Sequence, residues 1–321
     1  MRRFLYRAGM WLLAAAILPL QSRAEMLVPV GKIIGLHLQN DTVTVAAYDD
    51  VFGEAARSAG LKIGDVIVEV NHCAVSCAED VRNALEVGGV PVELTVRRGG
   101  KLDSLSLVPR QTENGPRMGV YLRQGISGIG TVTFYDPETG LFGTLGHGVS
   151  DAVGGVLQMT RGNAYEAGIV SVKKGKPGDP GQLKGSAEKT EAFGSLLCNT
   201  TQGVFGITHL GWEGEAIPTA GYREITAGPA WIRCQVAGDA VRDYSAEILK
   251  IYPETRTDGR NFLLRITDET LLSCTGGIVQ GMSGSPIIQD GKLVGAVTHV
   301  LVNDPTRGYG IYIENMLNAA G

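Results

Sequence analysis

The sequence has little charge and no long block of one sign. Only 19% of its 321 residues are charged, and the formal net charge is −4. Proteins that bind nucleic acid usually carry a basic patch, so this balance gives no electrostatic case for a nucleic-acid partner. The Gly/Pro/Lys segment 173–185 also lacks the Gly-Lys-Ser/Thr ending of a phosphate-binding loop. We therefore expect no organic cofactor.

Cysteines are few and odd in number. The chain has five, and an odd number cannot pair completely within one chain. His72, Cys73 and Cys77 lie close together, but their spacing is not that of a zinc knuckle and no second ligand pair follows. The sequence thus predicts no metal site, and free thiols or one or two disulfides remain open.

Long apolar runs are absent except near the N-terminus. Three arginines within the first seven residues precede the 13-residue apolar run 8–20, and Ser22-Arg23-Ala24 resembles a small-x-small cleavage site. This pattern predicts a secretory signal over residues 1–24. The run is short for a membrane-spanning helix, which needs about 20 residues, but an uncleaved anchor stays open. We expect export across the cytoplasmic membrane, with tethering through this segment until it is cut.

Glycine is abundant, at 45 residues, about twice the usual ~7%. That many glycines without a collagen period predict many tight turns and short strands, hence a mainly β protein. The hydrophobic content of 44% is enough for two cores. We expect a small domain over 26–110, a polar linker over 111–118 and a larger domain over 119–321.

The segment Ala55–Val75, AARSAGLKIGDVIVEVNHCAV, resembles PDZ domains of bacterial proteases. The resemblance implies a small β domain with two helices, expected at 54–58 and 76–85, that binds an extended peptide by strand addition. The ligand would be a C-terminal peptide or the protein's own N-terminal segment. We expect its groove between the second helix and four residues of the first strand: Ile33, Ile34, Gly35 and Leu36. A small β domain without a ligand is the alternative.

The stretch 275–292 has the features of a serine nucleophile. Ser283 lies in Gly281-Met-Ser-Gly284-Ser-Pro, ahead of an apolar strand. The glycines permit a tight turn, and the N–H groups of Gly281 and Ser283 can form an oxyanion hole. An ordinary Gly/Ser turn between strands has the same composition, so other residues must support the assignment.

A histidine and an aspartate stand in suitable chain order. His147 follows an expected strand and is flanked by glycines, and Asp268 precedes Ser283 by 15 residues (283 − 268). The order His, Asp, Ser is that of chymotrypsin-type enzymes. The aspartate would hold the imidazole tautomer and stabilise its positive charge. Asp151 and Asp304 are competitors for this role, and Asp268 could instead cap a helix.

The serine motif also resembles the G-x-S-G-x-P signature of chymotrypsin-type proteases, which implies a double β-barrel. Met282 occupies the position where pancreatic-type enzymes carry an aspartate, so that ion pair on activation is impossible here. In such folds the strand after the nucleophile pairs with substrate. That strand would place Thr298, His299 and Val300 beside the first specificity pocket.

Taken together, the chain resembles the SpoIVB peptidases, the stage IV sporulation protein B family. The resemblance rests on Gly130–Pro137 (GTVTFYDP), Leu145–Asp151 (LGHGVSD) and the long run 275–316. A PDZ domain ahead of the protease domain separates this family from HtrA proteases, which carry it behind. The resemblance carries the catalytic set onto His147, Asp268 and Ser283.

The resemblance implies a signalling serine endopeptidase without metal or cofactor. Such a protease is secreted from the forespore into the space between the two cells. It cuts itself near its N-terminus, here expected between Ala24 and Gly35. It then cleaves the regulatory partner of a membrane-embedded protease, which triggers sigma-K precursor processing. Two alternatives remain: an HtrA-like envelope quality-control protease, and a secreted PDZ adaptor with a dead protease domain.

Overall fold

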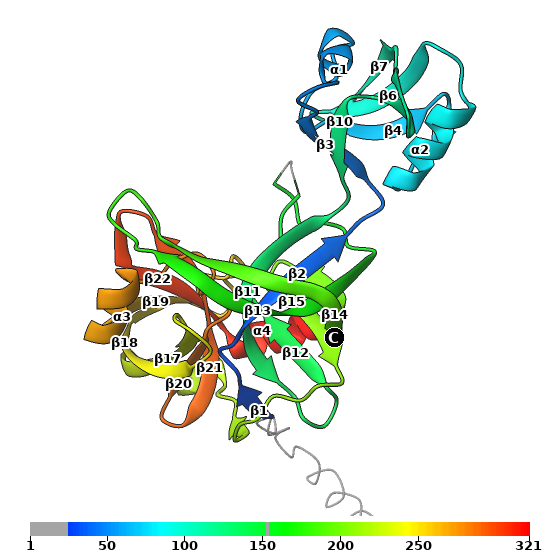
Figure 1. Cartoon of the computed structure of the whole chain (residues 1–321). Coiled ribbons are helices and arrows are strands. Elements are labelled where there is room, and N and C mark those ends of the chain that lie inside the picture. The colour runs from blue at the N-terminus through cyan, green and yellow to red at the C-terminus, as the bar shows by residue number, and fades with distance from the viewer. Residues whose placement is uncertain (1–24, 152–153) are drawn as a thin grey trace, which may run out of the picture.

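The structure is a computed structural model that describes residues 25–151 and 154–321. Strands dominate it, which confirms the mainly β prediction. Figure 1 shows a small domain at one end, joined by extended strands to a larger body. The predicted secretory signal over 1–24 lies outside the described residues. Within them, no helix is long and apolar enough to cross a membrane.

The small domain is a sheet in the strand order β10-β3-β4-β6-β7, with β5 paired to β4. Its strands are β3 (Val43–Tyr48), β4 (Val66–Val70), β5 (Cys73–Ala74), β6 (Val92–Arg98), β7 (Lys101–Leu107) and β10 (Val120–Arg123). Two helices accompany the sheet, α1 (Glu54–Ser58) and α2 (Ala78–Val87), as the sequence predicted. A separate apolar core lies between the sheet and the helices.

The domain boundaries differ from the predicted ones. Strands β1 (Met26–Pro29) and β2 (Ile33–Gln39) belong to the larger body, where β2 lies between β11 and β13. The predicted linker 111–118 contains most of a hairpin, β8 (Arg110–Thr112) and β9 (Gly115–Arg117), and β10 belongs to the small sheet. The small domain is therefore inserted between β2 and β11. A strand's partners are set by long-range pairing, which the local sequence does not specify.

The first half of the body is a ring of six paired strands. In order around the ring these are β2, β11, β12, β15, β14 and β13, and the pairing of β12 with β11 closes it. Strands β1 and β16 extend the sheet from β11. The bounds not yet given are β11 (Ile126–Tyr135), β12 (Leu141–Thr144), β13 (Arg161–Lys173), β14 (Gln182–Thr200), β15 (Gly203–Thr208) and β16 (Ile217–Pro218).

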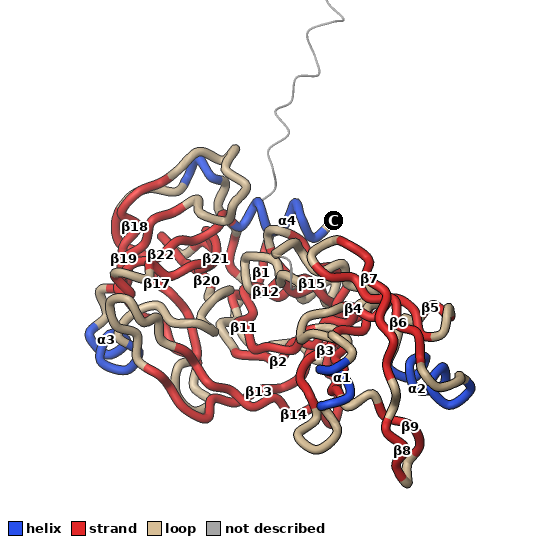
Figure 2. The backbone as a smooth tube through the Cα atoms, turned by 90° about the horizontal axis from the view of Figure 1, so that it is seen from above, coloured by secondary structure: helices blue, strands red, loops and turns tan. Residues whose placement is uncertain are grey.

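The second half is a closed barrel in the strand order β17-β18-β19-β22-β21-β20. Figure 2 shows this barrel beside the first ring, with the small domain on the other side of that ring. Its strands are β17 (Gly228–Gln235), β18 (Val241–Ile251), β19 (Phe262–Ile266), β20 (Pro286–Gln289), β21 (Lys292–Leu301) and β22 (Asp304–Tyr312). A 3-10 turn (Tyr222–Glu224) precedes β17, and α3 (Glu269–Thr275) follows β19.

The terminal helix α4 (Ile313–Ala320) joins the two halves. Its buried Ile313 and Met316 share an apolar cluster with Phe134 and Phe205 of the first ring and with Leu293 of the second barrel. Burying a large apolar side chain contributes about 1.5–3 kcal/mol, so this cluster holds the halves in a fixed relation. The junction between them is where the candidate site lies.

Candidate functional site

Ser283 lies in a tight turn at the entry to β20. The N–H of Met282 donates to Val279 O at 3.1 Å, and the N–H of Gly284 donates to Val297 O of β21 at 2.7 Å. The Met282 side chain is fully buried in the core of the second barrel. The turn is thus fixed from both sides, which places Ser283 at the barrel's edge with its side chain only partly buried.

The two N–H groups predicted to form the oxyanion hole are not used by the fold. Met282, Gly284 and Ser285 each donate to a backbone carbonyl. In contrast, neither Gly281 nor Ser283 donates its N–H to any acceptor among residues 25–151 and 154–321. Unused N–H groups beside a nucleophile are what a developing oxyanion requires, and one such donor is worth roughly 3 kcal/mol of barrier.

Two buried threonines of β11 connect the serine turn to the histidine loop. Thr131 donates its N–H to Ser283 O at 3.1 Å and its hydroxyl to Gly281 O at 2.8 Å. Its carbonyl accepts the N–H of Leu145 at 3.3 Å, and the hydroxyl of Thr133 donates to Gly284 O at 2.7 Å. Sequence reasoning did not assign these residues a role. Their alternation with apolar residues in the family motif GTVTFYDP was the available indication.

His147 follows β12 and enters the junction from the first ring. A Cβ at Gly146 would lie 2.9 Å from Thr298 Cγ2, so only glycine lets this loop pack against β21. His147 Nδ1 lies 3.0 Å from Gly148 O. A carbonyl can only accept, so Nδ1 carries the proton in the neutral ring and Nε2 is left as the base. Burial lowers the pKa of His147, and the bond to Gly148 partly opposes this.

The serine hydroxyl is bonded to the backbone in this state. Ser283 Oγ donates to Thr298 O of β21 at 2.9 Å. The hydroxyl must therefore leave Thr298 O before its proton can pass to His147. Catalytic hydrogen bonds are often incomplete in ligand-free enzymes and form only in the complex, so this geometry is compatible with a nucleophile and base pair.

The ring of His299, on β21, lies beside that of His147, with centroids 5.4 Å apart and planes at 40°. Burial, the charge of His147 and that of Arg260 lower the pKa of His299 to about 4, while Asp258 opposes the shift. Its Nδ1 is buried and has no hydrogen-bond partner in the described chain. The sequence predicted this residue only as part of a substrate-binding strand.

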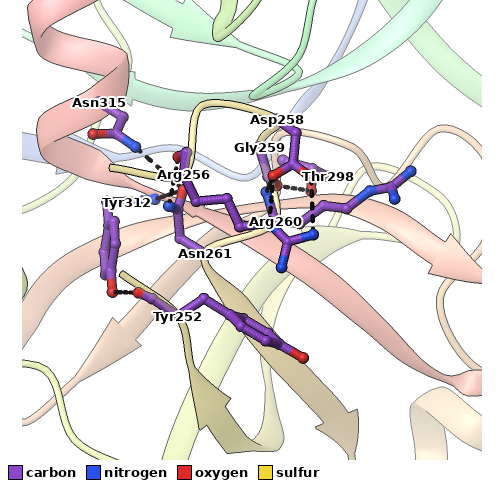
Figure 3. Close-up of polar contacts among 9 residues, drawn as sticks. All are labelled: Tyr252, Arg256, Asp258, Gly259, Arg260, Asn261, Thr298, Tyr312 and Asn315. Carbon is purple, nitrogen blue, oxygen red and sulfur yellow. Dashed lines mark hydrogen bonds and ion pairs between the residues drawn. The ribbon is translucent and has the colours of Figure 1, made fainter. Parts of the chain in front are cut away.

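The loop between β18 and β19 covers this part of β21 (Figure 3). Thr298 Oγ1 donates to Gly259 O at 2.7 Å. A Cβ at Gly259 would lie 3.9 Å from His299 Cε1. Asp258 next to it accepts hydrogen bonds from Nε and Nη2 of Arg256, at 2.7 and 2.9 Å. The loop therefore brings paired charges close to the two histidines.

The structure does not bring Asp268 to His147. Asp268 is the N-cap of α3: its Oδ1 accepts the N–H of Leu271 at 2.9 Å and its Oδ2 that of Ser245 at 3.5 Å. In both overall views α3 lies at the outer edge of the second barrel, away from β12, which leads to His147. The helix-cap role weighed for Asp268 is the observed one.

The competitor Asp151 lies on the loop after His147, where its Oδ1 accepts the N–H of Gly155 at 3.0 Å. It also lines a cavity of about 220 Å³ between the small domain and the first ring, together with Arg97 and Arg123. The described contacts of Asp151 are therefore with its own loop and with the lining of this cavity.

The predicted peptide groove at Ile33–Leu36 is wrong. These residues form the middle of β2 and pair with β11 on one side and β13 on the other, so no edge remains for a peptide. A groove does exist in the small domain, between α2 and β10. It encloses about 480 Å³ and is lined by Val81, Arg82, Leu85, Arg117, Val120 and Leu122, among others. Strand β10 is an edge strand, which leaves one side for strand addition.

All five cysteines are free thiols, with Cys73 exposed and Cys234 buried. Within residues 25–151 and 154–321, no group of three or more His, Cys, Asp or Glu side chains could hold a metal ion. The site chemistry thus rests on the serine turn and the two histidines.

Ser283, His147 and two unused N–H groups lie at the junction of two barrels, an arrangement that suits a serine peptidase. The model of the SpoIVB peptidase family, peptidase S55, matches residues 114–317, which is well over half of the chain. The protein belongs to this family, and the resemblance noted from the sequence is confirmed.

Individual relatives match shorter segments. A putative zinc metalloprotease of Agrobacterium fabrum is 37% identical over 100 residues, covering 31% of this chain and 26% of its own length. Serine protease HTRA1 of Xenopus tropicalis is 34% identical over 58 residues, 18% of this chain and 13% of its own. The chain thus spans about a quarter or less of these relatives.

Solved structures are more distant. The Rv3671c protease of M. tuberculosis in its active form is 16% identical and covers 61% of this chain and 73% of its own, with a TM-score of 0.34. Its inactive form gives 14% identity, the same coverage of this chain and 85% of its own, also at a TM-score of 0.34. These scores are too low to carry an argument about function.

Proposed function

We propose that this protein is a serine endopeptidase of the sporulation-signalling type, with Ser283 as nucleophile and His147 as base. The observation that carries the proposal is the pair of unused N–H groups, on Gly281 and Ser283, in a turn where the neighbouring N–H groups are all bonded. Both residues are only partly buried, so their N–H groups are free to bond the oxyanion of a bound substrate. Membership of the SpoIVB peptidase family supports the same assignment.

The proposed reaction is acyl transfer followed by hydrolysis. Ser283 Oγ rotates from Thr298 O, gives its proton to His147 Nε2 and bonds to the substrate carbonyl carbon. The carbonyl oxygen becomes an oxyanion held by the N–H groups of Gly281 and Ser283. His147 returns the proton to the leaving amine, and a water molecule then hydrolyses the acyl-enzyme.

The substrate backbone is proposed to pair with β21 at Thr298–Val300. Strand β21 pairs with β20 only as far as Ala296, while its pairing with β22 continues to Leu301. The edge next to Ser283 therefore lacks a strand partner and can accept an extended peptide. Val300 is half-buried there and could contact a substrate side chain.

The small domain is proposed to act as a PDZ-like peptide-binding module. Its groove between α2 and β10 combines an unpaired strand edge with an apolar floor, which suits strand addition. Arg82 and Arg117 at this groove favour a ligand with a negative charge, such as a C-terminal carboxylate. The proposed ligands are the regulatory partner of a membrane-embedded protease or the protein's own N-terminal segment.

Self-cleavage is proposed to fall at or before Glu25. The range expected from the sequence reaches Gly35, but β1 and β2 are hydrogen-bonded within the body. Glu25 itself exchanges bonds with Thr219, at 3.1 and 2.9 Å. A protease needs an extended and accessible peptide, so a cut within these strands would require the first ring to open. Secretion from the forespore and initial tethering rest on the family alone.

The test follows the full-length chain over time by intact mass and N-terminal sequencing. We expect the wild type to trim itself, and Ser283→Ala and His147→Ala to stay intact. Ser273→Ala, an exposed serine on α3, is the matched control and should trim like the wild type. A fluorophosphonate probe, which phosphonylates an activated serine, should add its mass to the wild type and to Ser273→Ala, but not to Ser283→Ala.

The outcomes separate the alternatives. If Ser283→Ala trims as fast as the wild type, another protease makes the cut, and absence of probe labelling in the wild type would then favour a PDZ adaptor without activity. Labelling together with cleavage of many unfolded proteins would favour an envelope quality-control protease. Labelling together with one cut in one partner would support the signalling role.

A further inference from the structure

The proposed substrate edge of β21 also fixes where one substrate side chain must go. A peptide paired with Thr298–Val300 presents a carbonyl to Ser283 Oγ, and the residue that owns this carbonyl is the one before the cut. Its side chain faces the wall between β21 and the segment that leads into the serine turn. This wall is formed by Ile278, Val300 and Gly308. Its shape and charge therefore decide which side chains fit there.

Ile278 fills the wall on the side of the serine turn. Its N–H donates to Pro305 O of β22 at 2.8 Å, which ties the segment to that strand. Its side chain is only 2% exposed, and its Cδ1 would lie 2.6 Å from a Cβ at Gly308. The isoleucine thus occupies the space directly over the backbone of β22, and the glycine at 308 leaves room for it.

Val300 closes the wall on the side of β21. It pairs with Gly308, and its half-buried side chain packs against the same apolar cluster that contains Ile278. Two branched aliphatic side chains therefore stand around one glycine, where a large substrate side chain would need open space. Because β-branched side chains are stiff at χ1, neither swings aside at low cost.

The residue before Ile278 adds no charge to this wall. It is Gly277, and a Cβ there would lie 2.1 Å from Pro305 O, so no side chain fits. Asp304, at the start of β22, is already paired with Arg307 at 3.2 Å. A lysine or arginine before the cut would therefore lose contact with water without gaining a carboxylate, which is unfavourable.

We propose that Ile278 and Val300 restrict this peptidase to substrates with a small uncharged residue, such as alanine, serine or glycine, before the cut. The inference rests on the proposed function and names its substrate class. A larger side chain would meet branched carbons that are packed into the barrel core. The preference is set by two side chains other than Ser283 and His147, so it can be changed without altering the proposed nucleophile and base.

The test measures inactivation of the full-length protein by dipeptidyl diphenyl phosphonates that carry alanine, phenylalanine or lysine at the position before the cut. In each reaction Ser283 Oγ bonds to phosphorus, phenoxide leaves, and the serine proton passes through His147 to the phenoxide. The ratio of the maximal inactivation rate to the probe's inhibition constant, kinact/KI, reports how well each side chain fits.

The variants are Ile278→Ala and Val300→Ala, singly and together. Val302→Ala is the matched control, because this valine lies just beyond the wall and is 49% exposed. Thermal unfolding shows which variants fold. Val300→Ala, at a half-buried position, keeps the test decisive if Ile278→Ala does not fold.

For the wild type we expect kinact/KI to be at least about 100-fold higher for the alanine probe than for the phenylalanine or lysine probe. Each single variant should raise the phenylalanine value roughly tenfold, and the double variant more, because each change removes branched carbons from the wall. The lysine probe should stay poor in every variant, since none adds a carboxylate. Val302→Ala should behave like the wild type.

Two results would overturn the inference. One is a wild type that reacts with the phenylalanine or lysine probe within about threefold of the alanine probe. The other is a folded Val300→Ala or double variant whose phenylalanine value stays within about threefold of the wild type.

The fluorophosphonate probe, which carries no such side chain, separates these failures from that of the proposed function. If it labels the wild type but not Ser283→Ala, the peptidase assignment stands whatever the preference before the cut. If it labels neither protein, the proposed function and this inference fall together.

Discussion

The serine turn and the histidine loop meet at one junction but are held in different ways. The serine turn is fastened by backbone bonds to β21 and by the hydroxyls of Thr131 and Thr133. The His147 ring is held by one carbonyl and one neighbouring ring. The proposed nucleophile and oxyanion donors are thus held by backbone bonds, while the proposed base depends on side-chain contacts that can adjust when substrate binds.

The largest effect should come from a substitution that disrupts the serine turn. A Cβ at Gly284 would lie 2.0 Å from Thr131 O and 2.5 Å from Leu145 N, at a φ of +95°. We expect Gly284→Ala to lose at least about 3 kcal/mol of unfolding free energy, because the clash is with backbone, and to abolish probe labelling. Urea unfolding measures the loss.

Gly291→Ala is the matched control for this substitution. Gly291 also has a positive φ, +73°, but nothing lies within 4 Å of its Cβ position. It should cost only about 1–2 kcal/mol and keep labelling. Equal losses in the two variants would show that backbone strain, and not the contact with Thr131 and Leu145, limits position 284.

An intermediate effect should come from a substitution of Thr131, which connects the serine turn to the histidine loop. Thr131→Val removes the hydroxyl bond to Gly281 O and leaves that partly buried carbonyl without this donor. We expect a loss of about 1–2 kcal/mol in unfolding free energy. The rate of probe labelling should fall roughly tenfold, because the proposed oxyanion donors lose their support. Thr131→Ser keeps the hydroxyl and should restore most of the rate. Unchanged labelling of Thr131→Val would show that the serine turn keeps its conformation without the Thr131 hydroxyl.

A smaller effect is expected away from the junction. Asp268→Ala removes the N-cap of α3 and should cost about 1 kcal/mol of unfolding free energy. Glu269→Ala removes a first-turn charge but no capping bond, so it should cost less. Both changes are read from thermal and urea unfolding. A stability loss for Asp268→Ala no greater than that for Glu269→Ala would contradict the capping role.

The smallest effect is on the pH dependence of the labelling rate, which tests the environment of His147. Burial lowers the pKa of His147 below the ordinary value of about 6.5, so the ring stays neutral, and able to act as base, in more acidic solution. The labelling rate should therefore hold its plateau below pH 6.5 before it falls. A half-maximal rate at or above pH 6.5 would contradict this environment.

The free energy of unfolding should also decrease as the pH is lowered. Both histidines bind protons less readily in the folded state than in the unfolded state. Their contribution is therefore fully present above about pH 6.5 and is lost as the pH falls toward about 4, where His299 protonates. His299→Phe should reduce this acid sensitivity when unfolding is measured at several pH values.

Local patterns predicted the local parts of this molecule well. The serine turn is defined by residues within a few positions of one another, and the glycine next to His147 is required by its packing on β21. Pairing across long distances could not be predicted in the same way. Ile33–Leu36 reads as a strand in either domain, and its partners lie about 90–130 residues further along. The spacing between Asp268 and Ser283 fits a triad and a helix cap equally well.

The insertion of the small domain also sets an order of events during synthesis. Strand β2 leaves the ribosome long before β11, although Leu38 pairs with Ile126 in the finished ring. Residues 40–125 emerge in between and have an apolar core of their own, so they can fold first. Closure of the ring must wait for β11 and for the later strands. A chain caught part-way through synthesis therefore carries a finished small domain and no assembled pair of barrels.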